Sequence, residues 1–210
     1  MQAVGACDSY GAQYYTAHKD LLTSNSDLFK KHINDLSQIK ELCTEWRPLW
    51  LYVQWLYYRL IFSQCEERNY KTENEFTALM QAYVLGERLG DLDFKDAIID
   101  VFVETIDKVN CTPIYLIRQI YEKTEKDSPF RRLIVDIYLT RCNSLWLHVL
   151  DRSVVNEDFL WDLARRLTQR SPQSGKLTLN EPKKNTCVYH EHKGGVCYKK
   201  KGVHKPAKGL

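Results

Sequence analysis

The sequence predicts an α+β protein in which a small sheet is packed by helices, followed by a helical extension and a disordered basic tail. Residues 15–29 pass from a short strand into a serine-capped helix, and residues 49–58 are apolar on every side of a helix. From residue 171 onward helical periodicity stops, and Pro, Gly, Ser, Asn and Lys dominate. We therefore expect three parts, covering residues 1–110, 111–170 and 171–210.

Four short strands are expected in the first part. Residues 3–5 and 13–17 predict a hairpin, because the Asp, Ser and Gly between them favour a turn. The alternation of apolar and polar residues over 38–43 and the apolar run 60–62 predict two further strands.

Helix boundaries in the first part follow from capping residues. Ser24 or Ser26 predicts the start of a helix that runs to about residue 34, and Pro48 predicts the start of the apolar helix 49–58. Trp55 lies within this helix, and we expect it to be buried. Apolar residues at spacings of three and four predict helices over 75–89 and 94–109, with Gly90 ending the first and Asp91 or Asp93 capping the second.

The second part begins with two hydroxyl–proline pairs, which predict helix starts because the hydroxyl caps and the proline occupies the first turn. These are Thr112–Pro113 and Ser128–Pro129. Asn156 predicts the start of a last helix over 157–169, whose apolar stripe comprises Phe159, Leu160, Leu163 and Leu167.

Read as a series, these elements resemble the BTB/POZ domain, in the form carried by fungal proteins. The first half matches through a His-Lys-x-x-Leu helix entry at His18, a Ser-x-x-Phe helix at Ser26, and a Trp-Leu-Tyr helix followed by a strand. Further similar segments are residues 82–91, 94–100, 120–124, 128–136 and 189–192.

The resemblance implies a non-enzymatic protein–protein interaction module, an adaptor or assembly scaffold, whose partners are other proteins. Adaptor members of the family bind a cullin scaffold near an acidic Phe-x-Glu segment. This chain has the basic run Lys30–Lys31–His32 there, which weakens the expectation that a cullin is its partner. Members commonly dimerise through an N-terminal strand, and only residues 1–5 remain to form it, so we expect a monomer or weak self-association.

Catalytic chemistry is not indicated. His18, Asp20 and Ser24 suggest a triad, yet their position at a strand-to-helix junction favours capping and packing, and no Gly-x-Ser-x-Gly elbow accompanies them. The sequence has no glycine-rich phosphate loop, His-Glu-x-x-His helix or Cys-x-x-Cys pair. We expect no enzyme, no catalytic residue and no cofactor.

The tail contains four nitrogen and sulfur donors within eleven residues, which could close a tetrahedral zinc site: Cys187, His190, His192 and Cys197. Their close spacing and the lack of flanking apolar residues favour a flexible tail without metal. Residues 176–210 carry nine lysines against Glu181 and Glu191, a net charge of +7. Zinc binding or weak, salt-sensitive nucleic-acid binding through this tail is therefore the alternative function.

Cysteine usage and hydropathy favour a cytoplasmic or nuclear protein. The seven cysteines are odd in number and irregularly spaced, which does not indicate a disulfide framework, and no secretory leader pattern is present. The longest apolar stretch, residues 50–62, is interrupted by Gln54 and Arg59 and is too short to cross a bilayer, so we expect no membrane association.

Overall fold

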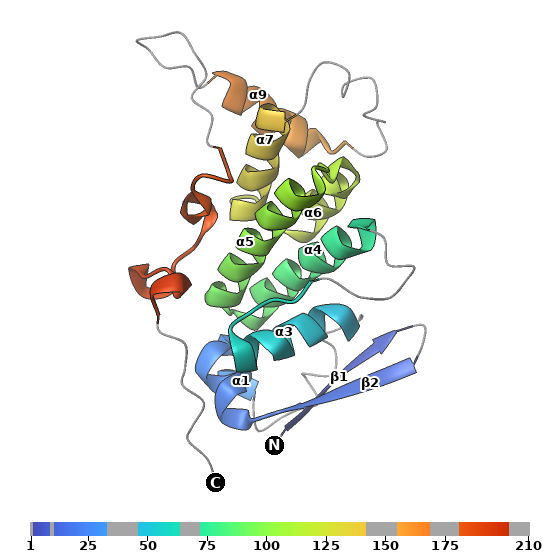
Figure 1. The fold of residues 1–210 in the computed structure, drawn as a ribbon, viewed down its shortest axis with the longest axis vertical. Helices are drawn as coiled ribbons and strands as arrows, with labels where there is room; N and C mark the ends of the chain where they lie inside the picture. The colour runs from blue at the N-terminus through green and yellow to red at the C-terminus, as the bar shows by residue number, and fades with distance from the viewer. Residues whose placement is uncertain are drawn as a thin grey trace. The chain divides into compact units, whose positions relative to one another are not determined.

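The computed structural model describes residues 2–8, 11–32, 46–63, 72–141, 155–168 and 181–201. They belong to two compact units: unit 1 comprises Met1–Val101 with Glu191–Leu210, and unit 2 comprises Phe102–His190. Figure 1 shows that helices make up most of both units. The predicted α+β class, with a small sheet packed by helices, is therefore wrong.

Strand structure in the described part of the chain is confined to one hairpin. Strands β1 (Gln2–Asp8) and β2 (Gly11–Ala17) pair antiparallel along their whole length, so the predicted hairpin is present and its first strand is longer than expected. The predicted strand over 60–62 is absent, because Arg59 turns the chain with a φ of 55° and the following residues are irregular and exposed at Leu60 and Phe62. The predicted strand over 38–43 lies outside the described residues. Within the described ranges no further strand pairs with the hairpin, so it does not extend there into the expected sheet.

Unit 1 contains α1 (Lys19–Asn25), α2 (Asp27–His32), α3 (Trp46–Tyr58), α4 (Thr72–Leu89) and the first part of α5 (Leu92–Val109). Ser26 stands between α1 and α2 and is fully buried. Its hydroxyl accepts the amide of Phe29 at 3.2 Å and donates to the carbonyl of Leu89 at 2.6 Å. Of the two serines considered from the sequence, Ser26 is thus the cap, and it also fastens α2 to the end of α4.

The core of unit 1 is centred on α3, which lies beside the hairpin in Figure 1. Trp55 is buried, as predicted, and Tyr52 and Trp55 both contact Phe94 at the start of α5, with ring centroids 5.0 and 6.3 Å apart. The expectation that every side of this helix is buried is wrong, because Tyr57 and Tyr58 are exposed.

The turn between α4 and α5 matches its prediction closely. Gly90 has a φ of +66°, a conformation that glycine adopts without strain. Asp91 caps α5 by accepting the amide of Phe94 at 3.0 Å, and it also accepts the hydroxyl of Tyr52 at 3.3 Å. Burial, followed by the charge and hydrogen bond of Asp91, raises the pKa of Tyr52 well above its ordinary value.

Unit 2 is built on the short helix η2 (Ile114–Leu116), α6 (Ile117–Lys123), α7 (Pro129–Arg141) and α9 (Glu157–Thr168). Ser128 and Asn156 begin α7 and α9 as predicted, since their side chains accept the amides of Phe130 and Asp158. Thr112–Pro113, by contrast, precedes a 3₁₀ turn that leads into α6.

The core of unit 2 is aromatic. Phe159 lies between Tyr121 and Tyr138, with centroids 5.7 and 5.6 Å from theirs, and Phe102 meets Phe130 nearly at a right angle. Among the predicted stripe residues of α9, Phe159 is buried, whereas Leu160 and Leu167 are exposed. None of the helices in the described ranges combines the length and apolar composition needed to cross a membrane.

Candidate metal centre

The structure differs from the predicted disordered tail over residues 181–201. This stretch forms three short 3₁₀ helices: η3 (Thr186–Tyr189), η4 (Lys193–Gly195) and η5 (Tyr198–Lys200). Asn185 caps the first of them by accepting the amide of Cys187 at 3.1 Å. The rest of the predicted tail, residues 171–180 and 202–210, lies outside the described residues.

Four side chains converge along this stretch: Cys187, His190, His192 and Cys197. One ligand atom from each lies within 4.8 Å of all the others. All four come from a continuous run of eleven residues, so the local course of the backbone brings them together. The sequence prediction of a tail without metal rested on the close spacing of the four donors and on the lack of flanking apolar residues. The turns bring the four donors together despite that spacing.

Turn hydrogen bonds and residues with positive φ allow such a compact arrangement. The amide of His190 donates to the carbonyl of Cys187 at 3.2 Å, and the amide of Gly195 donates to the carbonyl of His192 at 2.8 Å. His192, Gly194 and Gly195 all have positive φ, at 45°, 68° and 77°. A side chain at either glycine would be strained by this backbone even though no atom lies within 4 Å of its Cβ position. The chain therefore reverses sharply between His192 and Cys197.

The donor set suits zinc. Two thiolates and two imidazoles in tetrahedral arrangement are a usual ligand set for structural Zn²⁺, and soft sulfur with nitrogen disfavours Mg²⁺ and Ca²⁺. With Zn–S near 2.3 Å and Zn–N near 2.0–2.1 Å, the edges of such a tetrahedron measure about 3.3–3.8 Å. The observed upper limit of 4.8 Å thus requires only small side-chain movements for closure.

Burial favours a structural ion. His190 and Cys197 are buried, and Cys187 and His192 are half-buried. Four protein ligands complete a tetrahedron, whereas catalytic zinc sites keep a position for water or substrate. The arrangement can hold a metal but offers no open coordination position for chemistry.

Asp96 supports the middle of the ligand run from outside the cluster. Asp96 is 1% exposed, and its carboxylate accepts the backbone amides of Glu191 at 2.8 Å and His192 at 3.2 Å. Hydrogen bonds to a charged acceptor are among the stronger ones, so Asp96 restrains the backbone that carries His192. Sequence reasoning missed Asp96, because nothing in the chain order links residue 96 to residue 192.

The neighbouring Lys95 restrains the same run through its side chain. Its ammonium group pairs with Glu191 and, at 3.3 Å, with Glu87. Burial acts to lower the pKa of Lys95, but the nearby Tyr83 and the two carboxylates outweigh it and the pKa is raised. Lys95 therefore keeps its charge and holds Glu191, which lies between the two histidines.

The other residues singled out from the sequence do not form a catalytic group. The Nδ1 of His18 lies 2.8 Å from the hydroxyl of Tyr57, while the hydroxyl of Ser24 donates to the carbonyl of Leu21 within α1. Asp20 is exposed in the first turn of α1. The structure thus does not assemble His18, Asp20 and Ser24 into a triad.

No protein-family model, curated protein or solved structure matches this chain. These comparisons therefore neither support nor oppose the BTB/POZ resemblance.

Proposed function

We propose that the protein binds one zinc ion through Cys187, His190, His192 and Cys197, and that the ion acts structurally. The observation that carries this proposal is the convergence of four ligand atoms within 4.8 Å of one another. Turns of three or four residues are marginal on their own, since each closes very few hydrogen bonds. A bound ion would hold these turns together, as a hydrophobic core does in larger domains.

The ion would hold a segment that covers an acidic stripe on α5. Asp93, Asp96 and Asp100 lie three and four residues apart and so share one face of the helix. Lys201 pairs with Asp93 at 2.7 Å, and Lys199 pairs with Asp100 at 2.9 Å. Because these two lysines are engaged within unit 1, the nucleic-acid alternative for the basic tail gains no support from the described residues.

Metal content of the purified full-length chain tests this function. We expect one zinc per chain by elemental analysis, and we expect Co²⁺ substitution to give the visible and near-ultraviolet bands of a tetrahedral thiolate site. Cys197→Ser should abolish stoichiometric zinc and weaken the thiolate bands. Cys111→Ser is the matched control, since Cys111 is an exposed thiol outside the cluster, and it should keep both.

Either of two results would contradict the proposal. One is a wild-type chain that takes up neither zinc nor cobalt when refolded with the metal. The other is a Cys197→Ser chain that binds as much metal as wild type, because the metal would then lie elsewhere.

A second candidate function is protein–protein interaction, the role that the BTB/POZ resemblance implied. It is favoured by apolar side chains that cluster at the end of α3 and just after it, exposed by 39–62%: Tyr57, Tyr58, Leu60 and Phe62. The rings of Tyr58 and Phe62 are in contact, at 6.5 Å between centroids. Contiguous apolar surface of this kind commonly marks a partner site.

Site-specific photo-crosslinking tests this second candidate. A photoreactive phenylalanine analogue at Tyr58 should cross-link a protein partner, and excess wild-type chain should compete, whereas excess Phe62→Ser chain should not. The control position is the exposed Glu104. Equal cross-linking from both positions would show that the apolar cluster is not the contact surface.

A further inference from the structure

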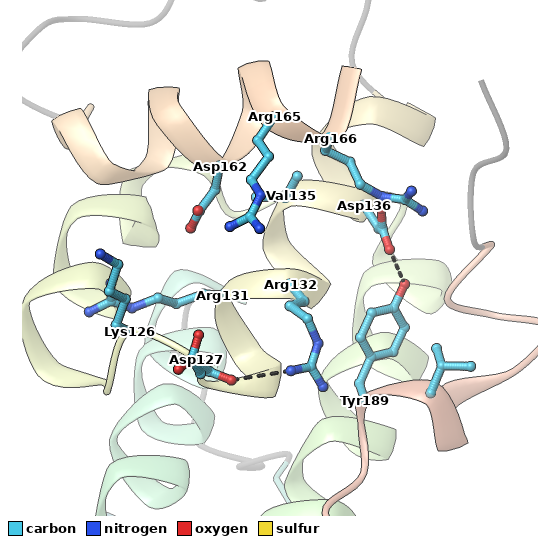
Figure 2. Close-up of a pocket in the computed structure, with 11 residues that line it drawn as sticks. Lys126, Asp127, Arg131, Arg132, Val135, Asp136, Asp162, Arg165, Arg166 and Tyr189 are labelled. Atoms are coloured by element: carbon cyan, nitrogen blue, oxygen red, sulfur yellow. Dashed lines mark hydrogen bonds and ion pairs between the residues drawn. The ribbon is translucent and has the colours of Figure 1, made fainter. Parts of the chain in front are cut away.

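A second site lies wholly within unit 2, formed by α7, α9, η3 and the turn between α6 and α7. It is a pocket of about 490 Å³, shown in Figure 2. Five basic side chains line it: Lys126, Arg131, Arg132, Arg165 and Arg166. Three acidic side chains also line it: Asp127, Asp136 and Asp162. Five cations against three carboxylates leave the lining with a net charge of +2.

Two of the arginines are committed to holding the walls. Arg131 is buried, donates to the carbonyls of Tyr121 and Thr124, and places its guanidinium 4.6 Å from the centre of the Tyr121 ring. Arg166 pairs with the buried Asp136 at 2.8 Å. These contacts make the pocket a built feature of the fold.

Two of the acidic groups are likewise engaged. Asp136 also accepts the hydroxyl of Tyr189 at 2.8 Å, the bond drawn in Figure 2. Asp162 accepts the hydroxyl of Tyr121 at 2.9 Å, and burial together with this bond raises the pKa of Tyr121. Neither carboxylate is therefore left to neutralise the remaining cations.

The remaining cations are available to a ligand. Lys126, Arg132 and Arg165 are exposed. Arg132 donates to the main-chain carbonyl of Asp127 at 3.1 Å, which carries no full charge. Within the described ranges, Lys126 and Arg165 make no side-chain ion pair. In Figure 2 the Arg165 side chain extends from α9 toward α7, and Lys126 and Arg132 lie across the pocket from it.

We propose that this pocket binds a small molecule that carries a phosphoryl group. Guanidinium groups donate paired hydrogen bonds that match phosphate oxygens, and cations at three positions around the pocket can each address a different oxygen. A phosphate monoester carries about −1.5 to −2 at neutral pH, which balances the lining charge of +2. The pocket volume falls within the range of about 300–1,000 Å³ typical of small-molecule sites, and Val135 and Val188 give it apolar wall area.

Calorimetric titration of the full-length chain, loaded with zinc, tests the proposal with phenyl phosphate as probe and benzoate as the matched monoanion. We expect saturable binding of phenyl phosphate, at least tenfold tighter than that of benzoate. Arg165→Gln and Arg132→Gln should each weaken phenyl phosphate binding at least tenfold. Arg118→Gln, which removes an exposed arginine outside this pocket, should leave the affinity unchanged.

The variants also separate this site from the metal centre. Arg165→Gln should keep its zinc and its melting temperature, so a loss of binding cannot be assigned to unfolding or to metal loss. The proposal is overturned if phenyl phosphate shows no saturation in the millimolar range, or if Arg165→Gln and Arg132→Gln bind it like wild type. Binding of a single-stranded oligonucleotide or a phosphoserine peptide, without binding of phenyl phosphate, would overturn it as well.

Discussion

The rings of Tyr198 and Trp55 meet edge to face, with centroids 5.5 Å apart and an interplanar angle of 76°. Trp55 belongs to the buried face of α3, and Tyr198 belongs to η5 in the C-terminal segment, residues 191–201. The hydroxyl of Tyr198 also donates to the carboxylate of Asp100. The C-terminal segment thus contributes side chains to the core of unit 1.

Tyr198→Ala should lower the free energy of unfolding by about 2 kcal/mol. It removes an edge-to-face aromatic pair, worth about 0.5–1.5 kcal/mol, and a hydrogen bond to a charged acceptor, here partly exposed. Tyr198→Phe keeps the ring and should cost about half as much. Urea denaturation followed by circular dichroism measures both, and the exposed Val196→Ala is the control. Unchanged stability of Tyr198→Ala would mean that the segment is not docked in solution.

Trp55→Ala should destabilise the protein by about 3–5 kcal/mol, the usual range for an aromatic residue truncated in a core. Trp55 is 1% exposed. Trp161 is 67% exposed on α9, so Trp161→Ala should change stability by no more than about 0.5 kcal/mol. Thermal and chemical melts of the two variants provide the comparison. Similar losses of stability for both variants would contradict the burial of Trp55.

Ser26→Ala should cost about 2 kcal/mol. The substitution removes the cap of α2 and leaves the carbonyl of Leu89 without the hydroxyl it accepts. Ser24→Ala is the matched control, because the hydroxyl of Ser24 is exposed and bonds within its own helix, and it should change stability by less than about 0.5 kcal/mol. A larger effect at Ser24 than at Ser26 in urea denaturation would reverse the assignment of the cap.

The buried phenol of Tyr52 should make stability fall at high pH. Its folded-state pKa is raised well above the ordinary 10.0, so above about pH 10 the unfolded chain loses this proton while the folded chain keeps it. The contribution of Tyr52 to the free energy of unfolding is therefore constant below about pH 10. It decreases as pH rises toward the folded-state pKa, by up to about 1.4 kcal/mol per pH unit.

Urea denaturation between pH 9 and pH 11.5 measures this slope. The free energy of unfolding of Tyr52→Phe should fall less steeply with pH, because this variant lacks the buried phenol. The exposed Tyr58→Phe should keep the parental slope. Equal slopes for the parent and Tyr52→Phe would show that Tyr52 ionises alike in both states.

Local features of the fold could be predicted from the sequence. Gly90 and Asp91 mark the α4–α5 turn, and Ser128 and Asn156 mark the starts of α7 and α9, because a cap needs only a few neighbouring residues. The burial of Trp55 followed from its place in the apolar run 49–58. The four donors of the candidate metal centre were visible as a pattern in residues 187–197, but the sequence interpretation favoured a tail without metal.

Long-range features could not be predicted. Nothing in the sequence indicates that Asp96 accepts the amide of His192, or that Ser26 and not Ser24 reaches Leu89. The expected strand over 60–62 shows the same limit, since an extended run becomes a strand only where a partner supplies its ladder. Chain order and periodicity determined where the helices begin and end. The tertiary structure decided which polar groups meet. These pairs join residues far apart along the chain, and such residues come together only when the helices pack.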